Sequence, residues 1–188
     1  PPGHGDIYSS LLGTGLLDKL LNEGVRFAFI SNSDNLGATL DVKILNSFKQ
    51  GGSSFLMEVT QRTETDKKGG HLAKRKDTGS LILREIAQSK EEDILAFQDI
   101  GKYRYFNTNN IWIRLDALKE HMMKSEGVLE LPIIRNRKTV NPKDYGSLPV
   151  YQLEVAMGAA IQCFEDSVAL NVPRSRFAPV KTSEDLFA

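Results

Sequence analysis

Short apolar runs of strand composition alternate with helical segments along this chain. Residues 25–31 (VRFAFIS) are apolar and aromatic and follow Gly24, which is typical of a strand buried on both faces. Further strands are expected at 55–60, 111–115 and 168–172, and helices at 41–50, 116–125 and 151–166. Strands that alternate with helices stack in layers around a mostly parallel sheet. The sequence therefore predicts an α/β domain.

Local signals refine this pattern. Leucines at helical spacing in 7–23 are interrupted by two glycines, which indicates one broken helix or two short ones. Asp41 is suited to cap the helix that follows it, and the glycines at 51–52 are suited to end that helix. Residues 71–76 and 81–87 flank a turn-forming string and predict a hairpin inserted into a mixed sheet.

Charge and cysteine content exclude several classes of protein. Lysine plus arginine and aspartate plus glutamate both number 24, and this balance argues against a general electrostatic nucleic-acid binder. The single cysteine, Cys163, rules out an internal disulfide framework and a multi-cysteine zinc site. No apolar run approaches the roughly 18 to 20 residues that a membrane span needs. We expect a cytoplasmic protein with neither a membrane nor a nucleic-acid partner.

A polar string follows the strand at 25–31. It reads SNSDN over 31–35 and places Asp34 between two asparagines at the carboxyl end of a strand, where α/β sheets bind ligands. Asp34 with its neighbouring amides offers the oxygen ligands that Mg²⁺ prefers. The same string is also typical of a turn or helix cap, and the residues alone favour that interpretation.

Three other polar strings are candidates for phosphate or sugar contacts. His4 lies in a glycine-flanked loop before a helix, where backbone N–H groups attract anions. The asparagines of 106–110 (FNTNN) present donors and acceptors that suit sugar hydroxyls. Three cations lie in the proline-braced loop at 172–181 and are suited to phosphates. A polar turn and surface ion pairs remain the alternatives for these strings.

Taken together, the strings resemble one family. PPGHGDIY, SNSDNLGA, MEV, KKGGHL, REIAQ, FNTNN, QLE, MGAAI and VPRSRFAPVK are similar in content and order to the UTP–glucose-1-phosphate uridylyltransferases, or UDP-glucose pyrophosphorylases. The resemblance implies a Rossmann-like nucleotide-diphospho-sugar transferase fold. It also implies the reversible, Mg²⁺-dependent conversion of UTP and glucose 1-phosphate to UDP-glucose and pyrophosphate.

The same resemblance assigns roles to single residues. The residues expected to be catalytic are Asp34, which would bind the metal, and Lys181 and His4, which would contact the phosphates. Those expected to bind substrate lie along the nucleotide, at the reaction centre and on the glucose hydroxyls; they are Gly3, Asn32, Gly70, Glu85, Asn107 and Asn109.

The chain also departs from the family pattern. Family members carry a glycine-rich, lysine-containing loop before this region and a left-handed β-helix domain after it. Neither is present in these residues, and the chain opens on a loop-like PPGH string. We therefore expect residues 1–188 to be part of a single nucleotidyltransferase catalytic domain, which is incomplete, cut from a longer polypeptide and inactive alone.

Two alternatives to this assignment remain open from the sequence. The chain could be a non-catalytic sugar-nucleotide-binding fragment. It could also be a sister pyrophosphorylase for other UDP-sugars or UDP-N-acetylhexosamine, although His4 stands where those enzymes call for an Asn-Gly string. A homo-oligomer, or assembly with complementing segments of the same protein, also stays open.

Overall fold

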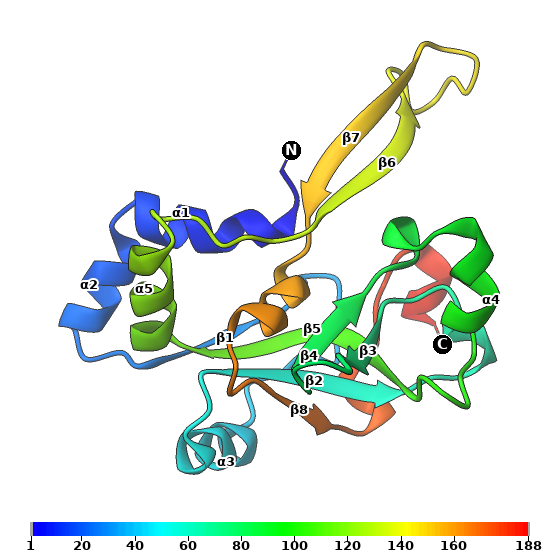
Figure 1. Cartoon of the computed structure of the whole chain (residues 1–188). Helices are drawn as coiled ribbons and strands as arrows, with labels where there is room; N and C mark the ends of the chain where they lie inside the picture. Colours follow the sequence, from blue (N-terminus) through cyan, green and yellow to red (C-terminus); the bar gives the residue numbers. More distant parts are fainter. Residues whose placement is uncertain (1, 188) are drawn as a thin grey trace.

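The computed structural model describes residues 2–187, and a mixed six-stranded sheet forms its body (Figure 1). The sheet has the order β4-β3-β5-β2-β8, and β1 pairs with β5. Its strands are β1 (Phe27–Ile30), β2 (Phe55–Gln61), β3 (His71–Lys74), β4 (Leu81–Arg84), β5 (Tyr105–Arg114) and β8 (Val168–Asn171). A separate hairpin pairs β6 (Ile133–Thr139) with β7 (Pro149–Val155). The α-helices are α1 (Ile7–Gly13), α2 (Leu16–Asn22), α3 (Val42–Gly51), α4 (Ile94–Phe97) and α5 (Leu115–Lys124).

The α/β class and the inserted β3–β4 hairpin are confirmed, but the prediction of a mostly parallel sheet is wrong for the strand pairings. Within residues 2–187, β2 and β8 are the one parallel pair, and the other pairings are antiparallel. The reason is that β5 runs against β1, β2 and β3 and lies between them. β1, β2, β3 and β8 thus share one direction, although β5 separates β1 and β3 from β2 and β8.

Helices cover both faces of the sheet. Side chains of α1, α2 and α5, such as Tyr8, Leu17 and Leu118, pack with Met57 of β2 in the larger core cluster. On the other face α3 contributes Ile44 and Phe48, which pack with Leu56 and Trp112. Successive residues of a strand point to opposite faces, so Leu56 and Met57 enter different clusters. Figure 1 shows α3 and the pair α2 and α5 on opposite sides of the sheet.

Local signals predicted most helices well. Two short helices, α1 and α2, replace one continuous helix at 7–23, as the interrupting glycines indicate. The carboxylate of Asp41 accepts from the backbone N–H of Lys43 at 2.7 Å, and Gly52 ends α3 with φ of 72°. Strand β1 is half-buried, so the prediction of burial on both faces was too strong.

The predicted helix at 151–166 is wrong. This region forms the end of β7 and a 3-10 helix, Met157–Cys163. Apolar Tyr151, Leu153 and Val155 alternate with Gln152 and Glu154, and this period of two is the pattern of a strand. Apolar content at 157–163 instead reflects a buried 3-10 segment that packs against the sheet.

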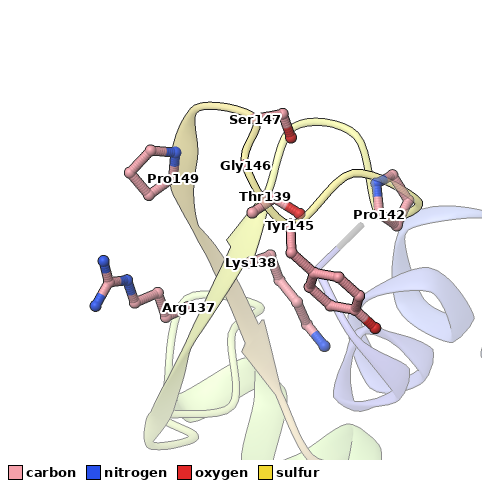
Figure 2. Close-up of a pocket in the computed structure, with 8 residues that line it drawn as sticks. All are labelled: Arg137, Lys138, Thr139, Pro142, Tyr145, Gly146, Ser147 and Pro149. Atoms are coloured by element: carbon pink, nitrogen blue, oxygen red, sulfur yellow. The ribbon is translucent and has the colours of Figure 1, made fainter.

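The β6–β7 hairpin projects from the body of the molecule (Figure 1). A hollow of about 680 Å³ lies at its tip, and Figure 2 shows that Lys138 and Tyr145 extend beneath its loop while Arg137 points away. The lining residues are Arg137, Lys138, Thr139, Pro142, Tyr145, Gly146, Ser147 and Pro149. None of the residues predicted to bind substrate lines this hollow.

Candidate functional site

A smaller cavity, of about 250 Å³, gathers most of the predicted site residues at one end of the sheet. Seven of them line it, namely Asn32, Asp34, Gly70, Glu85, Asn107, Asn109 and Lys181. Asn35, Gly69, Phe106, Phe177 and Pro179 complete the lining. Gly3 and His4 are not among the lining residues. These strings, far apart in sequence, therefore meet as one site.

Asp34 and Lys181 form an ion pair at this cavity. Lys181 donates from Nζ to Oδ2 of Asp34, and the backbone N–H of Val180 donates to the Asp34 carbonyl at 2.8 Å. The other carboxylate oxygen, Oδ1, is buried and has no hydrogen-bond partner among the described residues. A buried carboxylate oxygen without a donor favours a ligand that brings positive charge.

A bulge in β5 shapes the wall formed by the FNTNN string. Met57 pairs with Ile111 but Val59 pairs with Asn107, so β5 carries two extra residues at this point. Asn109 takes a positive φ of 58°, which asparagine tolerates better than most residues. This conformation explains why asparagines, disfavoured in regular strands, occur within β5.

The bulge turns the two predicted sugar-binding amides toward the same cavity. Asn107 donates from Nδ2 to Oδ1 of Asn109 at 2.7 Å, and its own Oδ1 accepts from the backbone N–H of Asn109 at 2.8 Å. Thr108 and Asn110 instead bond to Glu58, so they point away from the cavity. A bulge, and not simple alternation along the strand, thus brings Asn107 and Asn109 to the same cavity.

Gly70 and Glu85 lie in close contact on the β3–β4 side of the cavity. A side chain at Gly70 would place Cβ 2.4 Å from Oε1 of Glu85, so glycine leaves room for this carboxylate in its present position. Desolvation raises the pKa of Glu85 to about 7. Near neutral pH this side chain is therefore present both as a neutral acid and as a carboxylate, which can donate to or accept from a hydroxyl.

His4 contacts the segment Met157–Gly158, and Gly3 lies against Val155. The backbone N–H of Met157 donates to Nδ1 of His4 at 3.0 Å, which leaves Nε2 as the protonated, donating nitrogen. His4 is exposed on one side, but desolvation of its packed part lowers the pKa of the imidazole. Gly158 approaches Asn107 closely: a Cβ there would lie 2.6 Å from Nδ2. His4 is thus adjacent to the cavity wall without forming it.

The sequence did not reveal the buried groups beneath the cavity. Arg176 is bound to Glu58 and Arg174 to Asp66, so of the three cations in the loop at 172–181 Lys181 alone lines the cavity. The signal that could have indicated the first pair is an acid in the middle of an apolar strand, FLMEV, because a buried charge needs a partner.

The residues present fit a magnesium ion better than a zinc ion. The described part of the chain holds no group of three or more His, Cys, Asp or Glu side chains that could bind a metal by itself. Mg²⁺ is commonly held by one or two carboxylates together with substrate phosphates and water. Asp34, with its unpartnered Oδ1, suits such a site.

A mixed α/β sheet with an acid, a lysine and several amides at one end is the arrangement that the resemblance to nucleotide-diphospho-sugar transferases implies. The family model for UTP–glucose-1-phosphate uridylyltransferase matches residues 1–188. The chain belongs to this family. No helix among the described residues is long and apolar enough to cross a membrane.

Named relatives agree with this family assignment. The UTP–glucose-1-phosphate uridylyltransferases of Saccharomyces cerevisiae and Hordeum vulgare are 47% and 46% identical over 99% of this chain, which spans 36% and 37% of their lengths. A solved structure named UDP-glucose phosphorylase from Trypanosoma brucei is 58% identical with a TM-score of 0.92. A mutant UDP-glucose pyrophosphorylase from Leishmania major in complex with UDP-glucose is 54% identical with a TM-score of 0.90. Both cover 100% of this chain, which spans 40% and 42% of those chains.

Proposed function

We propose that the protein containing this chain transfers a uridylyl group from UTP to glucose 1-phosphate, giving UDP-glucose and pyrophosphate, and that it does so in the cytoplasm. A phosphate oxygen of glucose 1-phosphate attacks the α-phosphorus of UTP, and the bond from that phosphorus to pyrophosphate breaks. The observation that carries this proposal is the cavity in which the side-chain amides of Asn107 and Asn109, suited to bind hydroxyls, lie beside Asp34 and Lys181.

The chain's own residues act by positioning and by charge. Asn107, Asn109 and Glu85 offer donors and acceptors to the glucose hydroxyls, and Asn32 lies beside them at the reaction centre. Lys181 neutralises negative charge on the phosphates, and His4 donates from Nε2 to a phosphate oxygen. Mg²⁺, when bound, would neutralise phosphate charge, and Asp34 is the residue that would hold it.

No protein nucleophile is needed for this transfer. The lone thiol, Cys163, is half-buried, and desolvation raises its pKa to about 11, so it stays protonated at neutral pH. The reaction then depends on holding two phosphorylated substrates in line. This supports direct transfer between the substrates.

The test is pyrophosphate release by a protein that carries this chain together with the additional length found in its relatives. Glucose 1-phosphate with UTP should give the highest kcat/KM among sugar 1-phosphates, with release lost when Mg²⁺ is removed. Preference for N-acetylglucosamine 1-phosphate would favour the sister pyrophosphorylase. UDP-glucose binding without any turnover would favour a binding protein and contradict the proposal.

A further inference from the structure

A fully buried carboxylate lies beneath the candidate site. Glu58 of β2 is 0% exposed, and its carboxylate accepts from Nε and Nη2 of Arg176 at 2.6 and 2.8 Å. It also accepts from Nε1 of Trp112 at 2.9 Å and from Nδ2 of Asn110 at 3.1 Å. Charge-assisted, bidentate bonds from a rigid guanidinium fix the position of both partners closely. Arg176 is thereby anchored to the centre of the sheet.

The backbone of Arg176 is held as firmly as its side chain. Its carbonyl accepts from Nδ2 of Asn35 at 3.1 Å and from Nδ2 of Asn110 at 3.2 Å. A side chain at Gly37 would place Cβ 2.4 Å from the carbonyl oxygen of Ser175, so glycine allows the two backbones to approach. The start of the segment 176–181 therefore has little freedom to shift.

From Arg176 the chain runs beside the loop that carries Asp34. Oδ1 of Asn35 accepts from the backbone N–H of Ala178 at 2.8 Å, and Leu36 donates to the Ala178 carbonyl at 3.0 Å. The bond from Val180 to the Asp34 carbonyl continues this register up to Lys181. A continuous path of short hydrogen bonds thus joins Glu58 to the Asp34–Lys181 pair.

We propose that Glu58 is a positioning residue: through Arg176 it holds the segment 176–181 in register with the loop at Asp34, and so places the Lys181 ammonium for transfer. This inference rests on the proposed function. A buried ion pair is often no more stabilising than apolar side chains of the same volume, so fold stability alone does not require a charge within the apolar strand β2. The position of the segment 176–181 does require this charge, because the carboxylate of Glu58 anchors Arg176.

The test is a double-mutant cycle on kcat with Glu58→Gln, Lys181→Gln and the double variant, in the protein that carries this chain with the additional length of its relatives. If Glu58 acts through Lys181, Glu58→Gln should lower kcat about tenfold and leave KM for glucose 1-phosphate within about threefold. The double variant should then be no slower than Lys181→Gln, within about twofold. The fluorescence of Trp112 should change in Glu58→Gln because Trp112 loses a carboxylate partner.

The matched control is Phe48→Leu, which weakens the core cluster that lies under the same face of the sheet. It should lower Tm as much as Glu58→Gln while leaving kcat unchanged. If Glu58→Gln does not fold, Arg176→Lys takes its place in the double-mutant cycle. This variant keeps the positive charge and loses the forked contact with Glu58.

The outcomes separate this inference from the proposed function. A wild-type protein that releases no pyrophosphate would overturn the proposed function and this inference with it. An active wild type in which the losses in kcat from Glu58→Gln and Lys181→Gln multiply would overturn this inference alone, because the two residues would then act independently. A loss of kcat in Phe48→Leu equal to that in Glu58→Gln would also overturn it.

Discussion

Lys181 donates from Nζ to Oδ2 of Asp34, so the cation and the anion expected to act on phosphate and metal meet across one cavity. Within the chain each neutralises the charge of the other. A phosphate and a divalent cation arriving together can replace this pair with two new ones, Lys181 to phosphate and Asp34 to metal. The arrangement keeps both groups at the site without leaving an unpaired charge there.

Replacing Asp34 by asparagine should remove the charge and keep the shape. We expect kcat to fall about 100-fold, because the metal loses its anionic ligand. Tm should stay nearly unchanged, since partly exposed ion pairs contribute little to stability. Steady-state kinetics across a Mg²⁺ titration, beside a thermal melt, measure both. Activity within about twofold of wild type would show that Asp34 is not the metal ligand.

Lys181→Gln should lower kcat about tenfold or more and leave KM for glucose 1-phosphate nearly unchanged. The reason is that the ammonium contact strengthens as charge builds on the phosphates in the transition state. Lys181 is exposed, so its loss should cost little stability. Kinetics and chemical denaturation on the same preparations check this. Parallel losses of activity and stability would instead mark a structural ion pair.

Asn107→Ala should raise KM for glucose 1-phosphate several-fold and change KM for UTP much less, because this amide lines the cavity beside Asn109. The same ranking is expected for Asn109→Ala. Asn109→Gly separates side chain from backbone, since glycine adopts the positive φ of this position readily. If the glycine variant matches the alanine variant, the lost amide is the cause. A larger effect on UTP would place this string on the nucleotide.

Stability should depend on pH through Glu85. Its pKa is raised from 4.5 to about 7 by desolvation, so the folded chain binds the proton more tightly than the unfolded chain. Its contribution is fully present below pH 4.5 and is lost as the pH rises through 7, and the pKa difference corresponds to roughly 3 kcal/mol. Glu85→Gln should flatten this fall.

Another buried group titrates in the opposite sense. Desolvation lowers the pKa of His71 from 6.5 to about 4, so its contribution is lost as the pH falls below 6.5. For that reason the test of Glu85 compares the free energy of unfolding of wild type with that of Glu85→Gln, in denaturation series from pH 4 to 8. An unchanged difference across that range would contradict it.

The 188-residue chain alone should release no pyrophosphate above background. It spans 36 to 42% of the length of the relatives described above, and the family resemblance implies a phosphate-holding loop elsewhere in the protein. Without that loop, preorganisation worth several kcal/mol of the barrier is lost. Purified chain and longer protein, assayed side by side, provide the comparison. Similar rates would mean that the residues described here suffice for the chemistry.

Local signals predicted the parts of this molecule that depend on neighbours in sequence. The Asp41 cap, the β3–β4 turn and the polar strings after strands each carry their own chemistry, and most of the predicted site residues meet in one cavity. Pairings between distant segments left no such signal. Glu58 and Arg176 lie 118 residues apart, and nothing near either one names its partner.

The strand directions and the β6–β7 hairpin were missed for related reasons. Which strands lie beside β5 depends on the whole chain and not on local sequence. The alternation of strands and helices therefore predicted parallel neighbours, whereas in the structure β5 lies between β1 and β3 on one side and β2 on the other. The apolar residues that alternate along β7, such as Tyr151 and Leu153, are 59% and 57% exposed, so their period of two does not mark a buried face.

The place of β5 in the sheet has a consequence for synthesis of the protein. β1, β2 and β3 all pair with β5, and all three precede it in the chain. As the polypeptide leaves the ribosome, these strands remain without that partner until residues 105–114 emerge, although β3 can already pair with β4. Unpaired edges and apolar faces invite aggregation during such a wait. The residues that carry β1, β2 and β3 should therefore depend on chaperones until β5 has been translated.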